Sequence, residues 1–262
     1  MSPDSVMEEI IPAKIPVLGV GVTHFRDYDH AIEVVGQLIE ARTRAFIAAV
    51  NPEKIYKAQS KPALMEVLEE VDLAICDGIG AAWAVRVLTG RTISRITGVS
   101  LFYELVSQAP KNKWRIFLLG ASGDVNEAAR EKLLSDYPGL LIVGNLDGYF
   151  ESSAHVVRTI NNAKADIVFV GMGSPRQELW IRQHRNDIDA AICMGVGGTF
   201  DVVSGVVKWA PRVFRDTGTE WLYRLIREPK RIRRQLVLPK FVWMVMKHKM
   251  ETARKKRTRQ IT

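Results

Sequence analysis

DIVFVGMGSPRQE (residues 166–178) and AAICMGVGGTFD (residues 190–201) each join an apolar run to a glycine turn followed by polar residues. The apolar runs lack the polar residue at every second position that marks a half-exposed strand, so they indicate strands buried on both faces. Glycine lets the backbone approach a ligand closely. Both turns are therefore candidate ligand contacts.

The rest of the chain repeats this alternation of apolar runs and longer amphipathic segments. Strand-like runs occur at IPVLGVGV (15–22), RAFIAAV (44–50), LAICD (73–77), WRIFLLG (114–120) and LIVGN (141–145). Helical periodicity separates them at 29–42, 61–71, 124–137 and 155–164. Buried strands separated by helices predict a parallel sheet covered on both faces, an α/β fold of the Rossmann-like type.

In such sheets ligands bind beyond the carboxyl ends of the strands. The ends to inspect are NPE after Val50, DGIG after Cys76, GASGD after Leu119 and the two opening turns. GASGD offers Ser122 or Asp124 as a helix cap. The free N–H groups of that helix start either hold a phosphate or belong to an ordinary strand-to-helix corner.

Charge is unevenly distributed along the 262 residues. The net charge is +8, yet residues 208–262 hold 17 Lys or Arg against 4 Asp or Glu, whereas residues 1–207 hold 20 against 25. We therefore expect two parts, a Rossmann-like domain over 1–207 and a basic, aromatic appendage over 208–262. An appendage this basic is expected to meet a polyanion, whether phospholipid headgroups, phosphates or nucleic acid.

Apolar and basic residues interleave within the appendage. In EWLYRLI (220–226) the apolar side chains fall on one helical face, flanked by Arg224 and Arg227. LPKFVWMVMKH (238–248) is too short to span a bilayer but apolar enough to lie in the interface, with Trp243 at headgroup level. The pattern predicts membrane association; the alternative is a docked helix pair with a solvated charge run.

Cysteine use and the N-terminus predict a cytoplasmic protein. Cys76 and Cys193 have no CxxC partner, so we interpret both as buried thiols of a reducing compartment. MSPDSVMEEIIPAK is acidic and interrupted by proline, unlike a signal peptide. No stretch reaches the roughly 18 apolar residues that a membrane-spanning helix needs.

Several enzyme classes are disfavoured by missing motifs. No P-loop lysine follows any glycine turn, which argues against a Walker-type nucleotidase. VLGVGVTHF lacks the third glycine of a dinucleotide fingerprint, and no acidic residue ends RAFIAAV, which disfavours an oxidoreductase. The five histidines show neither HxxxH nor HExxH spacing. We therefore expect neither a metal site nor a cofactor.

Candidate chemistry centres on residues at the predicted strand ends. Asp77 follows a strand and is placed either to act as a general base or to cap the next helix. Arg95 either faces an anionic substrate or is solvated, and Asp201 either bonds a sugar hydroxyl or caps a helix. Gln177 and Glu178 begin a helix after Pro175, where the amide can reach a ligand and the carboxylate can close a capping box.

A set of motifs recurs in one order between residues 50 and 240: NPE, DGIG, RITG, FLLG, GMGSPRQE, GVGGTFD, KWAPR and EWLYRLIREPKRIRR. Together they resemble the WecG/TagA/CpsF family of bacterial glycosyltransferases over about three quarters of the chain. The resemblance implies an inverting hexosyltransferase. Its donor is expected to be a UDP-sugar and its acceptor a polyprenyl-diphosphate-linked saccharide at the cytoplasmic face of the plasma membrane.

The resemblance also implies a polymer class and individual site residues. Family members build teichoic acid, enterobacterial common antigen or exopolysaccharides, often from N-acetylmannosamine. The catalytic aspartate of the family matches Asp77, its arginine matches Arg95, and its motif glutamine matches Gln177. Basic residues that hold the lipid diphosphate fall at Arg224, Arg227 and Arg231. Further substrate contacts are expected at Asn51, Gly195, Gly197, Gly198 and Asp201.

Elementary chemistry agrees with these assignments. An inverting transfer needs one base to deprotonate the attacking hydroxyl, which suits an aspartate at a strand end. The departing UDP needs N–H dipoles or positive charge, which glycine turns or an arginine supply without a metal. Ala49 stands where the family often has threonine, which leaves the identity of the sugar open. The alternative is a nucleic-acid-binding protein that uses the basic tail; homo-oligomerisation stays open.

Overall fold

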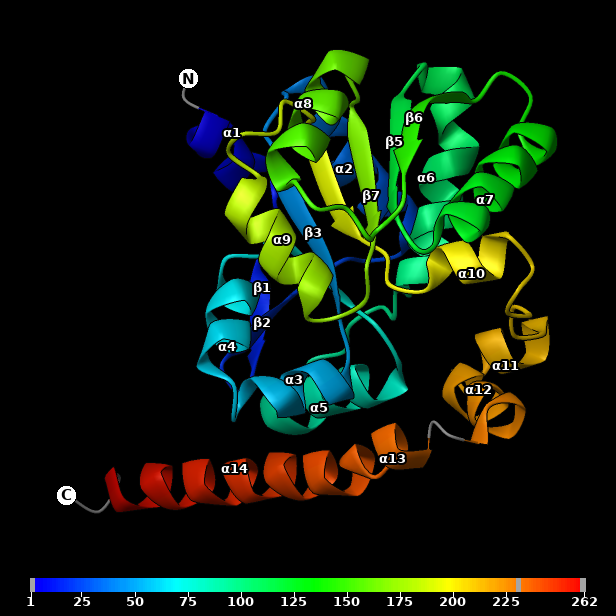
Figure 1. Cartoon of the computed structure of the whole chain (residues 1–262). Helices are drawn as coiled ribbons and strands as arrows, with labels where there is room; N and C mark the ends of the chain where they lie inside the picture. The colour runs from blue at the N-terminus through cyan, green and yellow to red at the C-terminus, as the bar shows by residue number, and fades with distance from the viewer. Residues whose placement is uncertain (1–2, 230–231, 260–262) are drawn as a thin grey trace.

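The computed structural model describes residues 3–229 and 232–259, and its centre is a six-stranded, all-parallel sheet (Figure 1). From one edge to the other the strands run in the order β4 (Leu73–Cys76), β3 (Ala45–Val50), β8 (Ile192–Gly195), β7 (Ile167–Gly171), β5 (Arg115–Gly120) and β6 (Leu141–Leu146). The predicted α/β fold with a parallel sheet is confirmed. All the carboxyl ends therefore meet at one edge.

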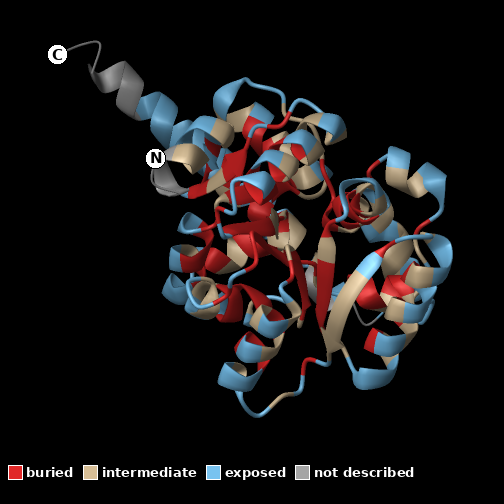
Figure 2. Cartoon of the chain, turned by 90° about the horizontal axis from the view of Figure 1, so that it is seen from above, coloured by how far each residue is buried: buried red, intermediate tan, exposed pale blue. Residues whose placement is uncertain are grey.

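Helices cover both faces of the sheet. One face carries α3 (Pro52–Ala58), α4 (Pro62–Glu69), α5 (Ile79–Thr89), α8 (Ser153–Ala163) and α9 (Arg176–His184). The other carries α2 (Tyr28–Glu40), α6 (Gly98–Asn112), α7 (Gly123–Asp136) and α10 (Thr199–Val203), with α1 (Pro3–Ile10) beside α2. Figure 2 shows the buried sheet between helices whose outer faces are exposed.

Strand β3 shows why two cores form. Phe46, Ala48 and Val50 point into the core under α3, α4 and α5, whereas Ala45 and Ile47 point into the core under α2 and α6. Successive side chains of a strand alternate between the two faces, so an unbroken apolar run supplies both cores at once. The sequence has no polar position in this strand because neither face meets water.

The run IPVLGVGV departs from the expected parallel sheet. It folds into β1 (Lys14–Val17) and β2 (Val20–Thr23), an antiparallel hairpin that forms a separate two-stranded sheet. Leu18 and Gly19 form its two-residue turn, both with positive φ, as hairpin turns of this length require. The Thr23 hydroxyl accepts a hydrogen bond from the Ala74 N–H at 2.9 Å. The hairpin thereby covers the outer edge of β4.

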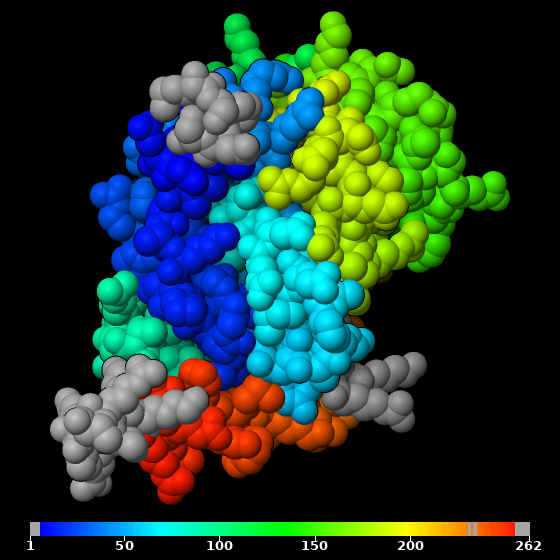
Figure 3. Space-filling view, turned by 90° about the vertical axis from the view of Figure 1, so that its left-hand side faces the viewer, coloured from blue at the N-terminus to red at the C-terminus, as the bar shows by residue number. Residues whose placement is uncertain are grey.

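The C-terminal segment continues into α11 (Arg212–Asp216), α12 (Glu220–Arg227), α13 (Ile232–Gln235) and α14 (Val237–Arg259). Helix α14 lies across α3 and α5 and buries Phe241 and Val245 in the core beneath them (Figures 1 and 3). Among the described residues, no helix is both long enough and apolar enough to cross a membrane.

Candidate active site

A cavity of about 690 Å³ lies at the carboxyl edge of the sheet, where α12 and α14 approach the ends of β3 and β4. Its polar lining includes Asn51, Asp77, Arg95, Glu220 and Arg224. Its apolar lining includes Trp83, Leu238, Phe241 and Val242. The body of the protein and the C-terminal segment therefore build this cavity together.

Asn51 is placed in the cavity by the start of α3. It is the N-cap residue, and its Oδ1 accepts a hydrogen bond from the Lys54 N–H at 2.9 Å. Pro52 follows at the first helical position, where its missing N–H removes no helical bond. This local geometry fixes the orientation of the Asn51 side chain at the edge of the cavity.

Asp77 follows β4, and its N–H donates to the Val50 carbonyl at 2.9 Å. The carboxylate does not cap α5, because the N-cap position is taken by Gly78 at φ +95°. The half-buried side chain lines the cavity instead. Of the two alternatives that the sequence leaves open, the structure shows the cavity position and not the cap.

Burial, helped by the nearby Glu220 carboxylate, raises the pKa of Asp77 to about 6. The positive charges of Arg224, Lys54 and Arg95 act in the opposite direction. A carboxyl group with this pKa is mostly ionised at pH 7 and yet accepts a proton more readily than an exposed aspartate. Asp77 therefore has the protonation behaviour of a general base.

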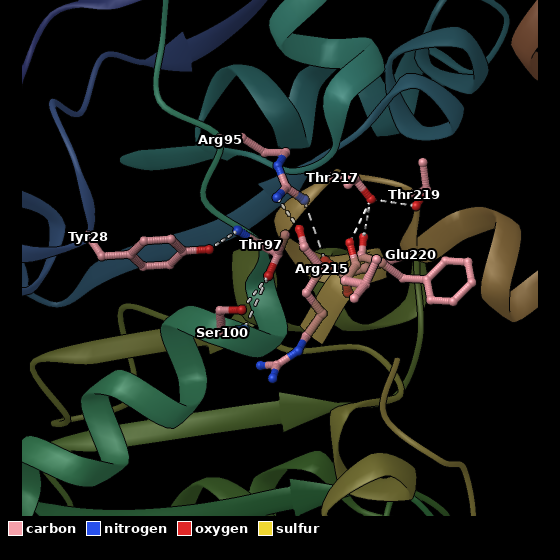
Figure 4. A network of polar contacts seen from close by, with 10 residues as sticks. Tyr28, Arg95, Thr97, Ser100, Arg215, Thr217, Thr219 and Glu220 are labelled. Atoms are coloured by element: carbon pink, nitrogen blue, oxygen red, sulfur yellow. Dashed lines mark hydrogen bonds and ion pairs between the residues drawn. The ribbon is translucent and has the colours of Figure 1, made fainter. Parts of the chain in front are cut away.

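Arg95 is held by the C-terminal segment (Figure 4). One guanidinium nitrogen donates to the Arg215 carbonyl, and the other lies 3.5 Å from Glu220 Oε1. Nearby, Thr97 caps α6, because its hydroxyl accepts a hydrogen bond from the Ser100 N–H. Its own N–H donates to the Tyr28 hydroxyl at 2.9 Å. These contacts hold the segment between α5 and α6 in place.

Glu220 is a site residue that the sequence analysis missed. It begins α12, and acidic residues are common in the first turn of a helix, so its position alone carried no functional signal. Its carboxylate lies in the same cavity as that of Asp77, opposite Arg95 and Arg224. Two carboxylates and two guanidinium groups thus share this part of the cavity.

The other predicted basic contacts differ in position. Arg224 lines the cavity, whereas the exposed Arg227 at the end of α12 is not among the lining residues. Arg231 lies outside the described residues.

The predicted contacts around the two glycine turns form a separate cluster. This cluster lies at the ends of β7 and β8, and the cavity lining includes none of its members: Gln177, Gly195, Gly197, Gly198 and Asp201. Gln177 is buried, with its Oε1 accepting from the Gly197 N–H and its Nε2 donating to Glu178 Oε1, both at 2.9 Å. Its amide is occupied by these internal bonds. Asp201 lies in the first turn of α10.

Glu178 does not close a capping box. It is fully buried and forms an ion pair with Lys54, with 2.8 Å between Nζ and Oε1. Burial by itself raises the pKa of Glu178, but the charge of Lys54 and hydrogen bonds from Lys54 and Gln177 hold it below its ordinary value. Within the described residues, no group of three His, Cys, Asp or Glu side chains has the geometry to hold a metal ion.

A parallel sheet covered on both faces, with a cavity at its carboxyl edge lined by Asp77, Arg95 and Arg224, is the arrangement in which α/β proteins bind small molecules. Comparison with known proteins defines the class further as a glycosyltransferase. The chain belongs to the glycosyl transferase WecG/TagA/CpsF family, whose sequence model matches residues 15–255.

Three relatives illustrate the similarity, and each is named N-acetylglucosaminyldiphosphoundecaprenol N-acetyl-beta-D-mannosaminyltransferase. The Bacillus spizizenii protein is 38% identical over 217 residues, which cover 83% of this chain and 84% of that protein. The Bacillus subtilis protein is 38% identical over 233 residues, 89% of each. The Staphylococcus aureus MRSA252 protein is 33% identical over 262 residues, covering 96% of this chain and all of that protein.

Proposed function

We propose that this glycosyltransferase moves a hexose from a UDP-sugar to a polyprenyl-diphosphate-linked saccharide, with inversion at the anomeric carbon. The observation that carries the proposal is the convergence of Asp77, Arg95 and Arg224 in one cavity at the carboxyl edge of the sheet. The names of the relatives supply the first candidates, N-acetylmannosamine as the sugar and GlcNAc-diphosphoundecaprenol as the acceptor. The product belongs to teichoic acid or a related cell-surface polysaccharide.

In the proposed reaction Asp77 removes the proton from the acceptor hydroxyl as the oxygen attacks the anomeric carbon. The new C–O bond forms on the face opposite the bond to the UDP oxygen, which breaks and leaves with both electrons. The proton stays on Asp77 until solvent removes it. A raised pKa suits this role, because the carboxylate is ionised before the reaction and basic enough to take the proton.

Charge on the leaving diphosphate needs compensation, which we assign to Arg95 and Arg224. Each guanidinium group has an opposite charge nearby, since Glu220 lies 3.5 Å from Arg95 and Asp77 interacts with Arg224. We assign Asn51, which lines the cavity with Asp77, to the contact with a substrate hydroxyl. Gln177 holds the GVGGTFD turn through the Gly197 N–H, and we assign the remaining substrate contacts to the backbone of this turn.

The appendage, residues 208–262, is proposed to bring the enzyme to the anionic inner face of the plasma membrane. Exposed apolar side chains accompany its basic residues on α12 and α14: Trp221, Leu222, Ile226, Trp243, Met246 and Met250. Shallow insertion of these side chains and attraction of the Lys and Arg residues to anionic lipid act together. This places the cavity beside the membrane, where a lipid-linked acceptor lies.

The experiment is UDP release from a panel of UDP-sugars, with and without a short-chain GlcNAc-diphospho-lipid. We expect release that depends on the acceptor and is selective for one sugar, with N-acetylmannosamine tested first. Asp77→Asn is the matched control, because it keeps the size of the side chain and removes the base. Acceptor-independent release, or full turnover by Asp77→Asn, would contradict the proposed reaction.

A further inference from the structure

One buried chain of polar contacts joins α3, α9 and the turn after β8 at the carboxyl edge of the sheet. Lys54 belongs to α3, Gln177 and Glu178 to α9, and Gly197 to the turn after β8. The Lys54 ammonium donates to the Ala49 carbonyl at 2.6 Å and to Glu178 Oε1 at 2.8 Å. Gln177 then bridges Glu178 Oε1 to the Gly197 N–H, with 2.9 Å for each bond.

The same chain reaches the cavity through Asn51. The backbone N–H of Lys54 donates to Asn51 Oδ1. The Lys54 ammonium group donates to the carbonyl of Ala49, which lies two residues before Asn51. Lys54 therefore fixes the end of β3 at both its backbone and its side chain. The Lys54 contacts therefore reach the turn that carries Asn51, which lines the cavity with Asp77.

The buried Gln177 side chain packs against Gly195. A Cβ atom on Gly195 would lie 2.6 Å from Gln177 Nε2, closer than side-chain atoms approach one another. A side chain at position 195 would therefore displace the Gln177 amide from its place across the end of β8. This gives a physical reason for the first glycine of GVGG that involves no ligand.

Stability alone does not explain a buried ion pair here. The side chain of Lys54 is 7% exposed and that of Glu178 is 0% exposed, so both charges have lost almost all contact with water. The attraction between buried charges seldom exceeds the penalty of removing them from water, and an apolar pair of the same volume is often as stable. The geometric effect of the pair is that it joins α3 and the end of β3, through Lys54, to α9, through Glu178.

We infer that Lys54 and Glu178 are positioning residues of the glycosyl-transfer site, a buried ion pair that holds the Asn51 turn and the GVGG turn in one fixed arrangement. The inference rests on the proposed function only in taking the cavity around Asp77 as the site of transfer. Neither residue lines that cavity, so both act through Asn51, Gln177 and the backbone of Gly197.

Lys54 also contributes to the charge around Asp77. The charged groups that act on this carboxylate are Arg224, Glu220, Lys54 and Arg95, and the Cys76 thiol is its neighbour in sequence. Of these groups, Lys54 differs in that its ion-pair partner is the buried Glu178, which does not line the cavity. Removing its charge raises the pKa of Asp77, since Lys54 is one of the groups that lower it.

The test uses the full chain and the variants Lys54→Met, Glu178→Gln and the double variant, which restores charge balance. Arg185→Met is the matched control: Arg185 belongs to the end of α9 and pairs with Asp72 at 2.7 Å, at the opposite edge of the sheet. The first readout needs no substrate. It is hydrogen exchange at the Gly197 amide, compared with the Val196 amide, which bonds the Val170 carbonyl within the sheet.

In all three variants of the pair we expect the Gly197 amide to exchange about tenfold faster or more, because the Gln177 bond that protects it is loosened. The Val196 amide should exchange at the same rate in the double variant as in the parent. Arg185→Met should leave the Gly197 amide unchanged relative to Val196. Unchanged Gly197 exchange in the double variant would overturn the inference.

The second readout is steady-state kinetics with the productive donor and acceptor. We expect kcat to fall about 10- to 100-fold in the double variant with a small change in KM, because small displacements of reacting groups have effects of this size. The acid limb of the kcat profile should move to higher pH in Lys54→Met and in the double variant. A double variant with parental kcat and an unmoved limb would also refute positioning. If Gly197 exchange responds as expected but the parent transfers no sugar, the proposed function fails and the positioning contact stands.

Discussion

At the scale of single residues, Asp77 carries the central prediction. Asp77→Asn should lower kcat by about 10²- to 10⁴-fold, the range that general-base catalysis supplies. The same change should stabilise the folded protein at pH 7 and above. Because the pKa of Asp77 is raised from 3.8 to about 6 on folding, the ionised carboxylate opposes folding by up to about 3 kcal/mol. Parallel assays of turnover and of thermal unfolding at pH 7.5 test both effects.

The pH dependence of that stabilisation has a definite sign. For an acid with a raised folded pKa, the native state binds more protons than the unfolded state between pH 3.8 and about 6, so stability falls as pH rises through this window. The stability gain of Asp77→Asn over the parent should therefore be absent below pH 4 and complete above pH 7. A gain that is independent of pH would show that packing, and not charge, is responsible.

Glu220→Gln tests the electrostatic role of the residue that the sequence analysis missed. Removing this carboxylate removes one of the causes that raise the pKa of Asp77, so the acid limb of kcat/KM, expected near pH 6 in the parent, should move to lower pH. Glu228→Gln, at the end of the same helix and outside the cavity lining, is the control and should leave the limb in place. A limb that moves upward in Glu220→Gln would mean that Arg95 had reoriented.

At the scale of elements, the contact between α3 and α5 sets the spacing of Asn51 and Asp77. A Cβ atom on Gly80 would lie 2.6 Å from Pro52 Cγ, so Gly80→Ala must push the two helices apart. We expect the free energy of unfolding to fall by about 1–3 kcal/mol and kcat to fall with it. Gly123→Ala, in the first turn of α7 with open space around it, should leave stability nearly unchanged or slightly raised. Equal stability for the two variants, measured by urea unfolding, would contradict this spacing argument.

Helix α14 has two faces with different tasks. Phe241 and Val245 are buried against the body, whereas Trp243, Met246 and Met250 lie on the opposite face and are exposed. This arrangement combines the two alternatives raised by the sequence, since the helix docks on the body and still presents apolar side chains outward. Membrane contact by the outward face remains a proposal.

At the scale of the whole molecule, the proposed orientation on the membrane is testable with vesicles. Replacing Trp243, Met246 and Met250 by serine should weaken binding to vesicles that contain phosphatidylglycerol without lowering the unfolding temperature. Tyr149→Ser, an exposed aromatic on the loop before α8, is the control and should bind as the parent does. Each Lys or Arg near an anionic membrane surface contributes about 1 kcal/mol of attraction. Because salt screens this attraction, binding should weaken as the salt concentration is raised. Undiminished binding by the triple variant would show that another face meets the lipid.

The sequence determined the fold class because hydrophobic periodicity fixes which surfaces must be buried. Apolar runs such as AFIAAV have no polar position, so they belong inside a parallel sheet wherever they pair. The same rule placed Asn51 and Asp77 together, since both directly follow strands of one parallel sheet. The IPVLGVGV run was misassigned because periodicity does not distinguish one long strand from two short ones joined by a turn at Leu18 and Gly19.

Tertiary structure alone decided how distant segments complete the site. Arg95 meets Glu220, and Lys54 meets Glu178, across more than 120 residues of chain. Nothing local in either carboxylate distinguishes these pairings from a solvated helix start, and the internal bonds of Gln177 to Glu178 and to the Gly197 N–H were likewise decided by the tertiary structure. The local sequence pattern determines which side chains are buried away from water. The docking of α9, α12 and α14 on the rest of the protein determines which buried charges lie next to one another.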